Sequence, residues 1–252
     1  MKFERLKFKG SQDHLLSARL DLPDEREPTA YAIFAHCFTC SKNLKAIHNI
    51  NMSLTAKGIA VLRFDFTGLG ESEGDFADTN FSSNVGDLVA AADYLRSNYT
   101  APKILIGHSL GGAAILQSAI SIPSSVAVST IGSPFDPGHV KALLRSTREQ
   151  IELQGEAEFV LAGRQFRIKK QFLDDLEQAK MDQFIRNLNK ALLIFHSPVD
   201  NIVGIDNAAK IFMTARHPKS FISLDKADHL LAEETDSKYV GAIIGTWAGM
   251  YL

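Results

Sequence analysis

The chain has 252 residues, of which 45% are hydrophobic, so it can bury a sizeable core as one large domain or two small ones. It carries 27 Lys and Arg against 29 Asp and Glu, a formal net charge of -2 with no block of like charge. This balance argues against nucleic acid as a partner, because phosphate binding needs a basic surface. Since no run resembles a signal peptide or a membrane span, we expect a cytoplasmic protein without membrane insertion. The sequence leaves the oligomeric state open.

Short apolar runs alternate with longer helical patterns, which is typical of α/β proteins. The runs Phe3–Phe8 and Leu15–Leu22 alternate polar and apolar residues around a Gly-Ser-Gln-Asp turn, and they predict an antiparallel hairpin at a sheet edge. The later runs are nearly continuous apolar strings, as in parallel strands covered on both faces: Tyr31–Ala35, Ala60–Phe66, Ile104–Ile106, Val126–Ile131, Ala191–Phe195 and Phe221–Leu224. Helical patterns fill most gaps: Leu44–Lys57, Asn84–Ser97, Gly111–Ile122, Asp206–Ala215 and Ser237–Met250.

The stretch from Asp136 to Asn189 is too long for a simple crossover between parallel strands. It begins with an amphipathic helical pattern at Val140, Leu143, Leu144 and Ile151. A hairpin pattern follows at Phe159–Ile168, with a turn at Ala162-Gly163. A second helical pattern then carries Phe172, Leu173 and Leu176. Because ligands bind outside the carboxyl ends of parallel strands, we expect residues 136–189 to form an inserted lid (cap). Residues 1–135 and 190–252 then form the core. The alternative is an excursion that only stabilises the sheet edge.

Ser109 lies in Gly107-His108-Ser109-Leu110-Gly111, directly after the apolar run Ile104–Ile106 and before a helical pattern. A G-x-S-x-G sequence between a strand and a helix is typical of the tight turn that projects a nucleophilic serine above a sheet. The glycines let strand and helix approach closely, and the helix N-terminus favours a developing oxyanion. A glycine-rich junction that contains a serine by chance is the alternative. We predict that Ser109 is the nucleophile of a serine hydrolase.

A serine nucleophile needs a base within hydrogen-bonding reach and a carboxylate that orients this base. Asp200 follows the run Ala191–Phe195, and His229 follows the run Phe221–Leu224, so both are expected at strand ends near Ser109. The chain order Ser, Asp, His is the order that α/β hydrolases use. The sequence therefore predicts Ser109, Asp200 and His229 as a catalytic triad.

Other acidic residues and histidines could compete for these roles. Asp136, which follows the preceding strand, is the alternative acid, and Asp225 and Asp228 are expected only to shape the histidine loop. The remaining histidines have structural interpretations, at strand ends or beside the triad (His36, His108, His196) and at the surface (His14, His48, His139, His217). Because no set of residues has the spacing of metal ligands, we expect no metal and no cofactor.

The oxyanion hole should use two backbone N–H groups, one from Leu110 and one from the loop after the run Tyr31–Ala35. In that loop His36-Cys37-Phe38 resembles the His-Gly-bulky sequence of many α/β hydrolases, with Cys37 in place of Gly, and the resemblance implies Phe38 as the second donor. The stretch Arg63–Ser72 resembles the family's D-x-R-G-x-G-x-S loop, with Thr instead of Arg, and a structural role is expected for it.

The resemblance to the α/β-hydrolase family covers nearly the whole chain. It implies the α/β-hydrolase fold, with a mostly parallel eight-stranded sheet, helices on both faces and an inserted lid. Phe34–Lys42 is similar to the hydrolase part of bacterial fusions with an OsmC-type thiol peroxidase domain, but since the chain ends after its last helical pattern we expect no peroxidase activity to be carried over.

The activity that these residues favour is a carboxylesterase that cleaves small to medium acyl esters through an acyl-serine intermediate. Its partner would be a small-molecule ester substrate. A thioesterase, an amidase or a lipase would use the same residues, and a non-catalytic ligand receptor on the same fold is a second class of function.

Cys37 and Cys40 are the only cysteines, too few for a disulfide framework. The simplest interpretation is a pair of buried thiols in a tight loop. The alternative is a redox switch, because Phe38 lies between the two cysteines and a disulfide would turn its peptide away from the oxyanion.

Overall fold

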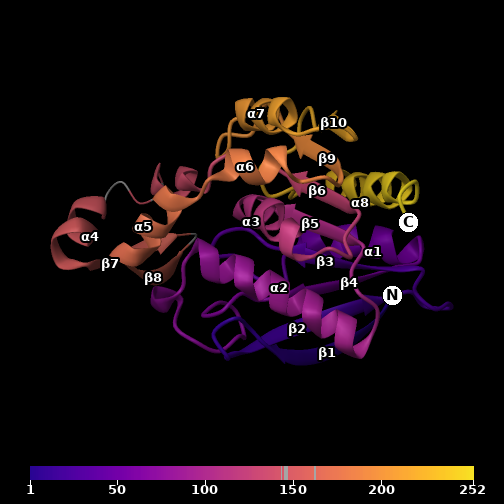
Figure 1. Cartoon of the computed structure of the whole chain (residues 1–252), viewed down its shortest axis with the longest axis horizontal. Coiled ribbons are helices and arrows are strands. Elements are labelled where there is room, and N and C mark those ends of the chain that lie inside the picture. The colour runs from indigo at the N-terminus through magenta and orange to yellow at the C-terminus, as the bar shows by residue number, and fades with distance from the viewer. Residues whose placement is uncertain (143, 145–146, 162) are drawn as a thin grey trace.

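The computed structural model describes residues 1–142, 144, 147–161 and 163–252. Its main sheet has eight strands in the order β1-β2-β4-β3-β5-β6-β9-β10 (Figure 1). The strands are β1 Lys2–Lys9, β2 Leu15–Leu22, β3 Ala30–Ala35, β4 Ile59–Phe64, β5 Ile104–His108, β6 Ala127–Ile131, β9 Ala191–His196 and β10 Lys219–Ser223. β1 and β2 form the predicted antiparallel hairpin, β2 pairs antiparallel with β4, and all other pairs are parallel. The predicted α/β-hydrolase sheet is therefore confirmed.

Burial along the strands separates the centre of the sheet from its edge. Every position of β3, β4, β5, β6 and β9 is buried, as the continuous apolar runs predicted. The prediction for β10 was wrong in this respect, since Phe221 is 41% exposed. β10 is an edge strand that pairs only with β9, so part of its side-chain surface faces solvent.

Helices cover both faces of the sheet (Figure 1). On one face, α1 (Lys45–Ala56) and α8 (Glu234–Ala248) pack together over a core that includes Ile50 and Ile244. The other face carries α2 (Phe81–Asn98), α3 (Leu110–Ser118), α7 (Asp206–Thr214) and the short 3-10 turns η1 (Phe76–Asp78) and η2 (Ala119–Ser121).

The helix α2 begins three residues earlier than its apolar periodicity indicates, at Phe81 instead of Asn84. Its first turn is fixed by a capping box. The Asn80 side chain accepts the Ser83 N–H at 2.8 Å, and Ser83 Oγ accepts the Asn80 N–H at 2.9 Å.

The segment 136–189, here called the inserted segment, lies between β6 and β9. It contains η3 Pro137–Ala142, α4 Arg148–Gln154, β7 Glu156–Leu161, β8 Arg164–Lys169, α5 Lys170–Gln178 and α6 Met181–Arg186. β7 and β8 form a separate antiparallel hairpin where one was predicted. Val140, Leu144 and Ile151 are buried. Leu143 of the amphipathic pattern and Ala162 of the turn lie outside the described residues.

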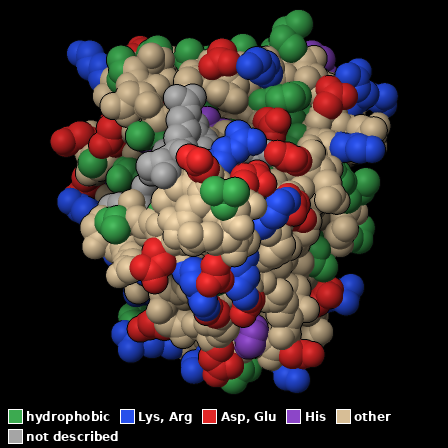
Figure 2. All heavy atoms as spheres, turned by 90° about the vertical axis from the view of Figure 1, so that its left-hand side faces the viewer, with side chains coloured by type: hydrophobic (Ala, Val, Ile, Leu, Met, Phe, Trp, Pro, Cys, Tyr) green, Lys and Arg blue, Asp and Glu red, His purple; other side chains and the backbone are tan. Residues whose placement is uncertain are grey.

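The inserted segment rests on the core through apolar and polar contacts. Phe172 and Ile185 belong to the same apolar cluster as α2 and α3, and α6 packs against α3 and α7. Polar bonds join β8 and α5 to the η1–α2 region, among them Arg167–Asp75 at 2.8 Å. Figure 2 faces this end of the molecule, where acidic and basic side chains are intermixed. The segment thus shares the core of the domain.

Candidate active site

Ser109 occupies the sharp turn between β5 and α3. Its φ of +55° lies in the left-handed region, which non-glycine residues rarely adopt, and its N–H donates to Ile131 O on β6 at 2.9 Å. The flanking glycines are required by close contacts. A Cβ on Gly107 would lie 2.4 Å from Gly111 O, and a Cβ on Gly111 would lie 2.4 Å from His36 O. The G-x-S-x-G spacing therefore provides the space that this strained turn needs.

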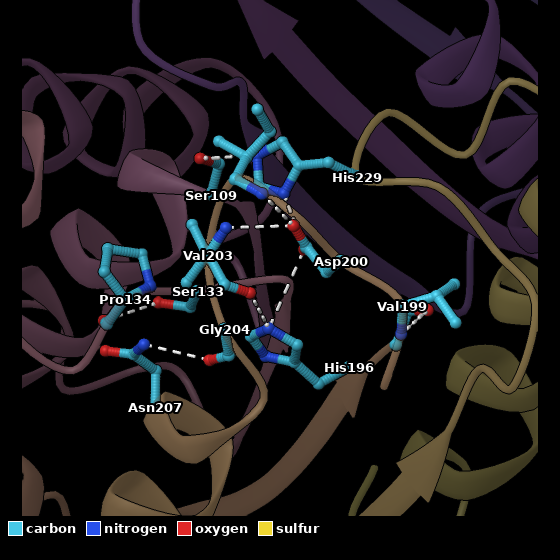
Figure 3. A network of polar contacts seen from close by, with 12 residues as sticks. Ser109, Ser133, Pro134, His196, Val199, Asp200, Val203, Gly204, Asn207 and His229 are labelled. Atoms are coloured by element: carbon cyan, nitrogen blue, oxygen red, sulfur yellow. Dashed lines mark hydrogen bonds and ion pairs between the residues drawn. The ribbon is translucent and has the colours of Figure 1, made fainter. Parts of the chain in front are cut away.

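The structure brings the three predicted triad residues together at the carboxyl ends of β5, β9 and β10. His229 Nε2 lies 3.0 Å from Ser109 Oγ, and His229 Nδ1 lies 2.7 Å from Asp200 Oδ2 (Figure 3). The other carboxylate oxygen, Asp200 Oδ1, accepts the N–H groups of Ile202 and Val203, both at 2.9 Å. These contacts form one hydrogen-bonded chain from a carboxylate through an imidazole to a hydroxyl.

The charge of Asp200 decides how His229 can act. Burial raises the pKa of Asp200, but the hydrogen bonds from His229 and from the Val203 and Ile202 N–H groups outweigh it and hold this pKa below its ordinary value. The ionised carboxylate assigns the His229 proton to Nδ1. Nε2 then directs a lone pair toward the Ser109 hydroxyl, which is the arrangement of a general base and a nucleophile.

The alternative acids have hydrogen-bond partners other than His229. Asp136 is exposed, and its Oδ1 accepts the Gly138 N–H at 2.8 Å. Asp225 accepts the Ser223 hydroxyl at 2.7 Å and Asp228 accepts the Ala232 N–H at 2.8 Å, so both shape the loop around His229.

The structure adds residues that sequence reasoning missed. Gly132, with a φ of +55°, directly follows β6, and a Cβ there would lie 3.4 Å from both Asp200 Oδ2 and His229 Nδ1. A glycine directly after a buried strand was the available signal. The Ile202 and Val203 amides had no signal, because any residue supplies an N–H.

Buried histidines hold the loops around the triad. His108 and His196 each place Nε2 2.7 Å from a main-chain carbonyl, of His229 and Val203 respectively. His36 is also buried, and its Nδ1 donates to Cys37 O at 2.8 Å. Of the four histidines expected at the surface, His217 is exposed, whereas the others are half-buried: His14, His48 and His139. Neighbouring side chains can cover part of a histidine ring, and a residue pattern does not show such contacts.

The two residues predicted to donate to the oxyanion line one narrow cavity. Leu110 is the first residue of α3, and Phe38 lies in the loop after β3. Both line this cavity of about 10 Å³, together with residues that include Phe76. A cavity of this size holds about one water molecule. In this structure the aromatic side chains therefore fill the space beside the serine turn.

The Phe38 ring lies under aromatic side chains of the inserted segment. Its centroid is 6.3 Å from that of Phe159 on β7, in a stacked arrangement, and 5.7 Å from those of Phe172 on α5 and Phe76 on η1. Arg164 on β8 donates to Thr39 O in the same loop at 3.2 Å. The inserted segment is therefore in direct contact with the loop of the proposed oxyanion donor.

Cys37 and Cys40 are joined by a disulfide, with their Cα atoms 5.3 Å apart. The interpretation of two free thiols is therefore corrected. The loop between β3 and α1 turns tightly enough for Cys40 N–H to donate to Cys37 O at 3.1 Å, and this turn brings the two sulfurs together. Directly after it, Lys42 is anchored by Asp65, which accepts the Lys42 N–H at 2.7 Å. This contact supports the structural role expected for the stretch Arg63–Ser72.

Metal-binding clusters and membrane-spanning helices are both absent from the residues that the structure describes. In residues 1–142, 144, 147–161 and 163–252, no group of three or more His, Cys, Asp or Glu is placed to hold a metal ion. No helix in the same part of the chain is long and apolar enough to cross a membrane.

Comparison with known proteins places this geometry in a family, because residues 32–242 match the Alpha/beta hydrolase family. The chain belongs to the alpha/beta hydrolase family. A solved esterase domain from a Rhodothermus marinus protein is 49% identical, with a TM-score of 0.81 over 100% of this chain and 99% of that one. Est1E from Butyrivibrio proteoclasticus, solved with ferulic acid, has a TM-score of 0.83 over 97% and 98% of the two chains but is 19% identical, so it supports the fold alone.

Curated relatives include another kind of alpha/beta hydrolase. The mouse palmitoyl-protein thioesterase ABHD10 is 28% identical over 188 residues, which cover 71% of this chain. The chain spans 62% of the length of this mouse protein and 42% of the length of its rat counterpart. These comparisons give no evidence for an OsmC-type fusion partner.

Proposed function

We propose that this alpha/beta hydrolase is a serine carboxylesterase that cleaves small to medium acyl esters. Ser109 would be its nucleophile, His229 its base and Asp200 the acid that orients the base. The observation that carries the proposal is the hydrogen-bonded chain of 2.7 Å from Asp200 to His229 and 3.0 Å from His229 to Ser109. The 49% identical esterase domain supports the same class of reaction.

In the proposed mechanism His229 Nε2 takes the Ser109 proton while Ser109 Oγ attacks the ester carbonyl carbon. The N–H groups of Leu110 and Phe38 stabilise the negative carbonyl oxygen of the tetrahedral intermediate. His229 then donates its proton to the leaving alcohol, and an acyl-serine remains. Water attacks this acyl group with His229 again as the base, which releases the carboxylic acid and restores the Ser109 hydroxyl.

The small cavity lined by Leu110, which follows Ser109, supports a preference for small to medium acyl groups. The cavity of about 10 Å³ has no room for an acyl chain until aromatic side chains move. Phe159 and Phe172 belong to the inserted segment, and we propose that this segment acts as a lid whose displacement admits the substrate.

A thioesterase is the second candidate, because the curated relatives include palmitoyl-protein thioesterases. The same triad would attack a thioester carbonyl and release a thiol instead of an alcohol. A long acyl chain would require a larger displacement of the aromatic side chains than a short one, so the closed cavity favours short acyl groups in either reaction.

The two candidates can be separated with matched substrates. Turnover would be measured on p-nitrophenyl esters from acetate upward and on acyl thioesters with the same acyl groups, with Ser109→Ala as the control protein. We expect ester turnover with a higher kcat/KM at short acyl groups and none in Ser109→Ala. Faster thioester turnover at every acyl length would support the thioesterase. Binding without turnover of either series would support a receptor.

A further inference from the structure

His108 occupies the position between Gly107 and the nucleophile, at the end of β5. Its side chain is buried, and its Nε2 lies 2.7 Å from the main-chain carbonyl oxygen of His229. The two imidazole rings lie 5.0 Å apart between centroids and are tilted by 43°. One strand end therefore carries both the nucleophile and a side chain that contacts the main chain of the base.

The chemistry of this contact fixes the role of each atom. A carbonyl oxygen can only accept, so His108 Nε2 carries a proton and donates it. The pKa of His108 is lowered to about 4, mainly by burial and also by the nearby His229 and His36 rings, while the bond to the His229 carbonyl and the charge of Asp200 oppose this shift. His108 is therefore a neutral donor at neutral pH. It adds no positive charge beside an imidazolium that would form on His229.

The contact also has a geometric consequence. His229 lies on the loop after β10, the edge strand of the sheet, whereas Ser109 follows the central strand β5. A bond from His108 to the His229 main chain ties this edge loop to the centre of the sheet. The distance between His229 Nε2 and Ser109 Oγ depends on that position, because the imidazole moves with its own main chain.

The acid loop is held in the same manner, which makes the arrangement more specific than ordinary core packing. His196 ends β9, is buried, and places Nε2 2.7 Å from Val203 O. Val203 N–H in turn donates to Asp200 Oδ1 at 2.9 Å. Figure 3 shows His196, Val203 and Asp200 in one network with Ser109 and His229.

We propose that His108 is a positioning residue, which holds the His229 loop at the distance from Ser109 that proton transfer requires. This inference rests on the proposed function, since it assigns His229 as the base. It predicts that the donor N–H matters, and that the ring or the charge of His108 does not.

The test compares two substitutions of the same residue. Gln at this position keeps an N–H donor at a similar reach, and Leu keeps an apolar volume without a donor. We expect His108→Leu to lower kcat for a p-nitrophenyl ester by about 10- to 100-fold with KM changed less than about threefold, since small misplacements of catalytic groups can cost about 100-fold. His108→Gln should retain kcat to within about threefold. His48→Gln, on the half-buried α1 histidine, is the control for loss of an imidazole.

A second readout separates positioning from stability. The low-field proton resonance of the His229 Nδ1–H···Asp200 bond should broaden or shift in His108→Leu and persist in His108→Gln. If His108→Leu does not fold, His108→Asn, whose shorter amide cannot reach the carbonyl, takes its place in the comparison with His108→Gln. Equal kcat in the Leu and Gln variants would overturn the proposal, whether both variants keep their kcat or both lose it. Ester turnover that survives Ser109→Ala would instead refute the proposed function itself, so the two failures are distinguishable.

Discussion

The carboxyl edge of the main sheet and the inserted segment are built in different ways. At the sheet edge, Ser109, Asp200 and His229 follow strands and are linked by bonds of 2.7 and 3.0 Å, with backbone donors fixing the carboxylate. The inserted segment is a two-stranded hairpin with short helices, and it meets the core through aromatic contacts and partly exposed polar bonds. We therefore propose that reaction chemistry depends on the sheet edge, whereas substrate selection depends on the inserted segment.

Removal of the nucleophile or the base should have the largest effect. Ser109→Ala and His229→Ala should each lower esterase kcat by about 10⁴- to 10⁶-fold, and the double variant should add little because the triad acts as one unit. Steady-state kinetics on a p-nitrophenyl ester would measure this. Losses that multiply in the double variant would contradict a single functional unit at the sheet edge.

The acid comes next. Asp200→Asn should lower kcat by about 10⁴-fold while the fold is retained, because an amide favours the wrong tautomer of His229. Asp136→Asn is the matched control, since Asp136 is exposed and lies in the inserted segment. A larger loss of kcat from Asp136→Asn than from Asp200→Asn would show that Asp136 is the acid of the triad.

The disulfide lies where the two regions meet, so its reduction tests how strongly one affects the other. The redox hypothesis states that the Phe38 N–H reaches the oxyanion only when the Cys37–Cys40 bond is open, so it predicts that reduction raises turnover by roughly 10²- to 10³-fold. Turnover would be measured before and after treatment with a dithiol, with thiol content followed by mass spectrometry. Cys40→Ser should be active and insensitive to oxidant. Equal turnover with the bond open and closed would show that the loop has no redox control.

The inserted segment should change selectivity more than rate. Phe159→Ala removes the ring that stacks on Phe38 and should raise kcat/KM for longer acyl esters about 10-fold relative to acetate. Leu153→Ala is the matched control, since Leu153 is on α4 and 78% exposed. An unchanged acyl preference would favour the purely structural interpretation of the segment. Single substitutions test this role more cleanly than deletion of the segment, because the segment shares the apolar core of α2 and α3 and its deletion would expose that core.

The smallest expected effect is on the free energy of unfolding, and it develops as the pH falls below neutral. The pKa of His108 is about 4 in the folded protein against an ordinary 6.5, so between these values the unfolded chain binds a proton that the folded chain does not. The free energy of unfolding should therefore fall as pH drops through this window, by up to about 3 kcal/mol. Below it, protonation of Asp200, whose pKa is also lowered, would remove further stability. Urea unfolding at pH 7 and pH 4.5 would detect a smaller loss in His108→Gln, and an identical loss would contradict this origin.

Sequence patterns predicted strands and the serine turn better than strand exposure, helix capping and long-range contacts, for a physical reason. Strands buried on both faces need continuous apolar runs, and the turn at Ser109 needs glycines at fixed spacing, so both leave a signal in the residues. The exposure of β10 and the Asn80 cap of α2 depend on sheet order and local hydrogen bonds. The bond from His108 to the His229 carbonyl joins residues far apart in the chain and uses a backbone acceptor, which no residue type marks.

The most direct test of the central claim is active-site labelling with a fluorophosphonate, which reacts with an activated serine hydroxyl. Peptide mass spectrometry of the labelled protein would locate the adduct. We predict one adduct, on Ser109, that forms in step with loss of esterase activity and is greatly slowed in His229→Ala. An adduct on another residue, or full inhibition without modification of Ser109, would contradict the assignment of Ser109 as the nucleophile.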